Sequence, residues 1–217
     1  MIMSNTPDII SISRHRINID GPGVTTLVAF RECPLSCKYC INEVCHYSKE
    51  KLLSKNILVR QLSATELYDI LKIDNLYFMA TGGGITFGGG EPGIYSDFIE
   101  DFKSICPKNW KINIETSLNI PTANLVKLIE IIDLFIIDIK DMSPEIYKKY
   151  TGIDNHLVYN NLKLLQSYEK KVYTKIRIPH IPDYNTPCNV YDSQVCLNRM
   201  GFTNIEIFDY VKPGTLA

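Results

Sequence analysis

Three cysteines on one short loop are the residues of this chain best suited to metal chemistry. Cys33, Cys37 and Cys40 are spaced by four and three positions in the segment Cys-Pro-Leu-Ser-Cys-Lys-Tyr-Cys. A structural zinc site uses four protein ligands, and ferredoxin clusters likewise use four cysteines. Three thiolates therefore predict a metal centre with one open coordination position, or a closed zinc or ferredoxin-type site completed by Cys45 or His46.

A glycine-rich segment over residues 81–92 is the second candidate. Its sequence is Thr-Gly-Gly-Gly-Ile-Thr-Phe-Gly-Gly-Gly-Glu-Pro. Glycine loses more conformational freedom on folding than any other residue, so a run of glycines destabilises the fold unless the missing side chains are required. Close approach of the backbone to a ligand would require them. A phosphate-binding loop is the alternative, but the segment lacks both the GxxxxGK[ST] and the GxGxxG patterns.

Together these two motifs resemble those of the radical S-adenosylmethionine superfamily, with CxxxCxxC first and Gly-Gly-Glu-Pro second. The resemblance implies a [4Fe-4S] cluster on Cys33, Cys37 and Cys40, with S-adenosylmethionine on the open iron. Reductive cleavage of that cofactor would give a 5′-deoxyadenosyl radical. It further implies that the cofactor is contacted by Tyr39 and the backbone of Cys40 and Ile41 near the adenine, and by Gly89, Gly90 and Glu91 near the methionyl amino group.

Four further segments resemble the activating enzymes of glycyl-radical enzymes, of the pyruvate formate-lyase activating type. They are Asp-Gly-Pro-Gly at 20–23, Gly-Gly-Gly-Ile-Thr at 82–86, Asp-Ile-Lys at 138–140 and Tyr-Thr-Gly-Ile-Asp-Asn at 150–155. The implied function is installation of a glycyl radical on a partner enzyme, with a flavodoxin or ferredoxin-type protein as electron donor. The alternative is an enzyme of the same fold that modifies a ribosomal peptide or a small metabolite.

The same resemblance assigns charged residues to the cofactor site. Thr116 and Asp138, with Glu115 where the family has Asp and with the backbone near Ile136, would form a monovalent-cation site. The methionyl carboxylate would be bound by two basic residues, Lys140 and Arg177.

Two positions depart from the family. Thr25 replaces an arginine, and Val211 stands where the family has a ligand-contacting histidine. The chain also stops at Ala217 without the family's last strand-flanking helix, which in the family helps to shape the mouth where the protein substrate enters.

Alternating strand-like and helix-like segments predict the framework that positions these residues. Strands alternating with helices indicate an α/β fold with a mainly parallel sheet, and the resemblance implies a partial (β/α)6 barrel formed by a single domain over residues 1–217. The motifs then fall at carboxyl ends of strands, where such folds bind ligands. We expect strands at 25–30, 85–87, 111–115, 134–138, 172–178 and 204–208, helices at 63–73, 95–105, 123–131, 155–168 and 187–199, and an irregular crossover at 45–63.

Composition limits the class of partner and the compartment. The formal net charge of -1 gives no general reason to expect nucleic acid or an anionic membrane as partner. No run of about 20 apolar residues and no signal peptide is recognisable, so we expect a cytoplasmic protein. Cys106, Cys188 and Cys196 are scattered and are expected to be ordinary thiols.

Overall fold

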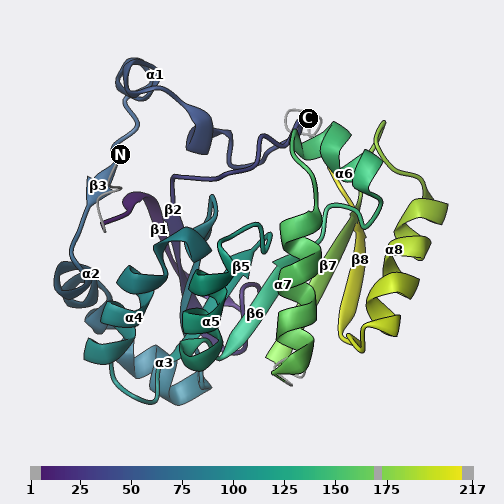
Figure 1. The fold of residues 1–217 in the computed structure, drawn as a ribbon. Helices are drawn as coiled ribbons and strands as arrows, with labels where there is room; N and C mark the ends of the chain where they lie inside the picture. The colour runs from purple at the N-terminus through teal and green to yellow at the C-terminus, as the bar shows by residue number, and fades with distance from the viewer. Residues whose placement is uncertain (1–5, 169–172, 212–217) are drawn as a thin grey trace.

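A computed structural model describes residues 6–168 and 173–211 of the chain. Its strands form one sheet in the order β3-β1-β2-β4-β5-β6-β7-β8 (Figure 1). The strands are β1 (Asp8–Ile17), β2 (Val24–Phe30), β3 (Arg60–Gln61), β4 (Gly84–Gly89), β5 (Lys111–Thr116), β6 (Leu134–Asp138), β7 (Thr174–His180) and β8 (Ile205–Asp209).

The parallel part of the sheet runs from β2 to β8 and contains six strands within the described residues. This confirms the predicted α/β class and the partial (β/α)6 barrel, since the sheet is open at both edges. Each of the six predicted strands has its counterpart. The predicted strand at 172–178 is β7, which begins at Thr174, while residue 172 lies outside the described residues.

Helices cross between successive parallel strands and cover one face of the sheet, with α4, α5 and α7 in front of the strands in Figure 1. A capping box stabilises the start of α2, because Ser63 and Glu66 each bond the other's backbone N–H. The helices are α1 (Lys49–Ser54), α2 (Ala64–Leu71), α3 (Asn75–Thr81), α4 (Ser96–Ile105), α5 (Thr122–Ile131), α6 (Pro144–Thr151), α7 (His156–Ser167) and α8 (Pro187–Arg199), with short 3-10 turns η1 (Glu43–His46), η2 (Lys72–Asp74) and η3 (Pro92–Tyr95).

Several elements were not predicted from the sequence. β1 lies near an edge of the sheet and is mostly exposed or half-buried, so it lacks a continuous apolar signal. The segment 45–63, predicted to be irregular, contains α1 and β3. α3 and α6 are only seven and eight residues long, which leaves too few turns for a clear helical period.

Aromatic side chains fill the core between the sheet and the helices. Phe30, Phe87 and Phe102 are completely buried, and their rings contact one another in sequence. Trp110 is also completely buried and donates its indole N–H to Asn75 at 2.8 Å. Within the described ranges, no helix combines the length and apolar character needed to cross a membrane.

Glycine is required at the end of β4 because two backbones meet there. A Cβ atom at Gly90 would lie 2.3 Å from the carbonyl oxygen of Glu32 and 2.8 Å from that of Arg31. The Gly90 N–H donates to the Phe30 carbonyl at 2.8 Å. The missing side chain at Gly90 therefore lets the end of β4 pack against the start of the cysteine loop, in addition to any role toward a ligand.

Replacing Gly90 tests this close approach. We expect Gly90→Ala to lower the free energy of unfolding by about 1–3 kcal/mol, because the added methyl group must displace backbone atoms. Gly82→Asn is the matched control, since a Cβ at Gly82 meets nothing within 4 Å and Asn tolerates the left-handed backbone found there. Urea unfolding followed by circular dichroism measures both; equal stability of the two variants would contradict the packing argument.

Candidate active site

One cavity of about 580 Å³ lies at the carboxyl ends of the parallel strands. A volume in this range suits a small-molecule cofactor. Loops and strand ends from β2 to β8 contribute to its wall, as the topology of an open parallel sheet predicts. Among the residues that line it are Cys33, Cys37, Tyr39, Cys40, Ile41, Gly89, Gly90, Thr116, Asp138, Lys140 and Arg177, all of them predicted from the sequence.

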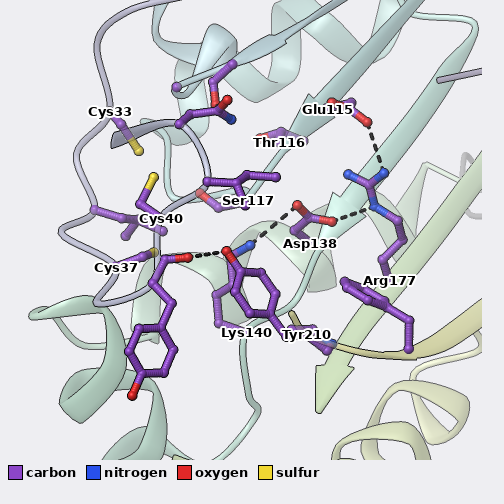
Figure 2. Close-up of a pocket in the computed structure, with 18 of the residues that line it drawn as sticks. Cys33, Cys37, Cys40, Glu115, Thr116, Ser117, Asp138, Lys140, Arg177 and Tyr210 are labelled. Carbon is purple, nitrogen blue, oxygen red and sulfur yellow. Dashed lines mark hydrogen bonds and ion pairs between the residues drawn. The ribbon is translucent and has the colours of Figure 1, made fainter. Parts of the chain in front are cut away.

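The three cysteines of the loop after β2 all face this cavity (Figure 2). Burial, with a smaller contribution from the negative charge of Glu91, raises the pKa of the Cys33 thiol to about 12. Burial also raises the pKa values of Cys37 and Cys40. The metal-free thiols are therefore protonated at neutral pH, and metal binding must release those protons.

Backbone hydrogen bonds hold the cysteine loop against the end of α6. Ser36 donates its N–H to the carbonyl of Thr151 at 2.9 Å, and Lys38 donates to that of Tyr150 at 3.1 Å. Tyr150 and Thr151 belong to the Tyr-Thr-Gly-Ile-Asp-Asn segment that was singled out in the sequence. That segment thus anchors the residues on both sides of Cys37.

The donor set fits an iron–sulfur cluster, because all three donors are cysteine thiols that face one cavity. A cluster takes one thiolate per iron, so the three cysteines would ligate three of its irons. Cys45 is buried with its Sγ 3.8 Å from the Phe30 carbonyl, and His46 is exposed; that Cys45 does not ligate iron stays a prediction.

The glycine motif adjoins the cysteine loop directly. The Asn42 side chain donates to the carbonyl of Gly89 at 2.7 Å, which joins the end of the cysteine loop to the end of β4. Gly89 and Gly90 line the cavity with their backbone. Sequence reasoning missed Asn42, because nothing in the local pattern distinguishes an asparagine that bonds a residue 47 positions away.

Glu91 lies behind the cavity wall rather than on it. Its side chain is completely buried, and its carboxylate accepts hydrogen bonds from the N–H of Gly93, the hydroxyl of Thr116, and both the N–H and hydroxyl of Ser117, at 2.6 to 3.1 Å. Burial raises the pKa of Glu91, and these four donated bonds oppose the rise. That Glu91 contacts the cofactor stays a prediction; in this structure its carboxylate bonds Thr116 and Ser117, which line the cavity.

Charged side chains from three neighbouring strands meet on the opposite wall (Figure 2). Arg177 donates to Asp138 at 2.6 Å and lies 3.0 Å from Glu115, while Lys140 donates to Asp138 at 3.4 Å. Burial alone would raise the pKa of Asp138, but the charges of Lys140 and Arg177 hold it below its usual value. In Lys140, burial opposes the charged form, yet Asp138 raises the pKa.

Tyrosines close the cavity on the side of β8. Tyr39 donates its hydroxyl to Asp183 at 2.9 Å, and its ring contacts that of Tyr184. Tyr210 donates its hydroxyl to the backbone carbonyl of Tyr39. Tyr210 was not predicted, and its position one residue after β8 was the only available signal.

Comparisons with known proteins identify a family and several relatives that this chain resembles. The sequence profile described as Radical SAM superfamily matches residues 27–186. The (2S)-3-sulfopropanediol dehydratase activating enzyme of Klebsiella oxytoca is 27% identical, with 98% of this chain and 85% of that protein covered. The pyruvate formate-lyase 1-activating enzyme of Escherichia coli strain K12 is 29% identical, with 77% and 65% covered.

Among solved structures, Streptococcus suis SuiB bound to S-adenosylmethionine superposes with a TM-score of 0.59 at 13% identity. It covers 86% of this chain, which spans only 39% of that protein, so the likeness concerns the fold alone. The alignment with the Klebsiella oxytoca enzyme runs over 271 positions, more than the 217 residues of this chain. That relative therefore carries inserted segments that this chain lacks.

The profile match covers most of the chain, so the chain belongs to the radical S-adenosylmethionine superfamily. Its members are enzymes that use a [4Fe-4S] cluster and S-adenosylmethionine, and Cys33, Cys37 and Cys40 line the cavity described above.

Substitution of single cysteines tests the cluster assignment. We expect Cys37→Ala to lose most of the cluster iron and its visible absorption, because one iron loses its thiolate. Cys45→Ala, which removes a neighbouring buried thiol, should retain about four irons per chain after anaerobic reconstitution. The reverse pattern would show that Cys45 is a ligand and would overturn the assignment.

Proposed function

We propose that this chain is an activating enzyme that installs a glycyl radical on a partner enzyme. The observation that carries the proposal is the single cavity shared by the cysteine loop, the glycine motif and the two basic residues Lys140 and Arg177. The names of the relatives support it, because the two reported above are activating enzymes. The four sequence segments that resemble such enzymes support it as well.

Each side chain has a defined part in this proposal. Cys33, Cys37 and Cys40 would hold three irons of the cluster and leave the fourth for the cofactor's amino and carboxylate groups. The Lys140 ammonium and the Arg177 guanidinium would bind that carboxylate by charge-assisted hydrogen bonds. A reduced cluster bound there would supply the electron for cleavage of S-adenosylmethionine, and the 5′-deoxyadenosyl radical from that cleavage would take a hydrogen atom from the substrate.

The protein's own contribution is positioning and exclusion of water. Ile41, Ile19 and Phe208 line the cavity although they are 70%, 57% and 36% exposed. Large apolar side chains that are exposed at a cavity mouth mark an interaction surface. A polypeptide segment covering them would bring a glycine α-carbon into the cavity and remove water from it.

Reduction of the cluster requires an external one-electron donor, for which we propose a flavodoxin or ferredoxin-type protein. Such donors work inside the cell, and we propose a cytoplasmic location.

Electron paramagnetic resonance on a mixture with a partner tests the proposal. The reduced, cluster-loaded enzyme with S-adenosylmethionine and the glycyl-radical enzyme of the same genome should give the doublet signal of a glycine-centred radical. Cys37→Ala in the same mixture should give none. Absence of the doublet, together with modification of a short precursor peptide by the same preparation, would contradict activation and favour the peptide-modifying alternative.

A further inference from the structure

Glu115 and Asp138 place two carboxylates side by side at the ends of adjacent strands. Asp138 pairs with Arg177 across β6 and β7, and Glu115 is on β5 beside them. All three side chains are largely buried, with 18%, 28% and 21% exposed for Glu115, Asp138 and Arg177. Two negative charges this close together need positive charge between them.

The Arg177 guanidinium supplies that charge. Its Nε is 2.6 Å from one Asp138 oxygen and its Nη1 is 3.0 Å from one Glu115 oxygen, so it bridges the pair (Figure 2). The side chain at 115 matters here, because glutamate is one methylene longer than the family's aspartate and its carboxylate reaches the arginine of β7. Lys140, 3.4 Å from the other Asp138 oxygen, balances the second negative charge.

We propose that the Arg177 guanidinium is the fixed counter-ion of the Glu115–Asp138 pair, so that this chain binds S-adenosylmethionine without a monovalent cation. The proposal rests on the proposed function and disagrees with the cation site that the family resemblance implies. A bound cation would add a third positive charge beside Arg177 and Lys140 and would compete for carboxylate oxygens that already accept hydrogen bonds.

Arg177 can bind the cofactor while it bridges the carboxylates of Glu115 and Asp138. A guanidinium has five N–H donors in one plane, and the two contacts with Glu115 and Asp138 use two of them. The bridge fixes the guanidinium plane at the cavity wall, which pre-organises the other donors toward a carboxylate in the cavity. Arg177 is therefore a positioning residue for the strand ends as well as a cofactor contact.

Cofactor binding in different salts tests the proposal. The affinity of the cluster-loaded enzyme for radiolabelled S-adenosylmethionine is measured anaerobically by equilibrium dialysis in potassium, sodium or choline chloride of equal ionic strength. We expect the Kd of the unmodified protein to agree within about twofold in the three salts. A fivefold or larger improvement in potassium or sodium over choline would overturn the proposal.

The variant Arg177→Gln should create a cation requirement. We expect at least tenfold weaker binding in choline chloride, with a recovery of fivefold or more in potassium or sodium chloride as an ion enters between the carboxylates. Lys175→Gln is the matched control: Lys175 lines the same cavity from the same strand but pairs with Glu206. Its affinity should show no such salt preference, and failure of Arg177→Gln to recover would contradict the counter-ion role.

Thermal unfolding without S-adenosylmethionine separates this proposal from the proposed function. The Tm of the cluster-loaded protein should be the same within about 1 °C in potassium and choline chloride, whereas the Tm of Arg177→Gln should be at least 3 °C higher in potassium. If the protein bound no S-adenosylmethionine in any salt, the proposed function would fail, but the Tm comparison would still decide the counter-ion proposal. A potassium-dependent Tm of the unmodified protein would overturn it.

Discussion

The completely buried carboxylate of Glu91 is the constraint on which the site depends. A buried carboxylate is costly unless hydrogen bonds compensate for its lost hydration, and Glu91 obtains four from Gly93, Thr116 and Ser117. These bonds hold the end of β4 and the end of β5 in a fixed position relative to each other. They present the backbone of Gly90 and the side chains of the turn after β5 to the cavity, while Gly90 packs against the start of the cysteine loop.

The opposite wall follows from the two-residue period of strands. Alternate residues of β7, namely Lys175, Arg177 and Pro179, line the cavity, as do Glu206 and Phe208 of β8. Charged residues on this face are stable because each carboxylate meets a cation from another strand, which is the adjacent strand for Asp138 and Glu206 and the second strand along for Glu115. The wall therefore combines paired charges with exposed apolar side chains, which suits a cofactor that carries both positive and negative charge.

Local sequence signals were sufficient for the motifs and the parallel core. The CxxxCxxC loop and the Gly-Gly-Glu-Pro segment were recognisable because spacing and glycine content are local properties, and both do follow parallel strands. What remained hidden depends on contacts between distant residues. β1 lies near an edge of the sheet and has little apolar pattern. The burial of the Glu91 carboxylate and the ion pair of Glu115 with Arg177 depend on residues of other strands rather than on nearby sequence.

We expect this cavity to support reductive cleavage of S-adenosylmethionine at a cluster on Cys33, Cys37 and Cys40. The most direct measurement is mass spectrometry of products after the anaerobically reconstituted protein is reduced with dithionite in the presence of the cofactor. We expect 5′-deoxyadenosine and methionine in equal amounts, formed only when the cluster and the reductant are both present. A protein that holds a full complement of iron and yet yields no 5′-deoxyadenosine under these conditions would contradict it.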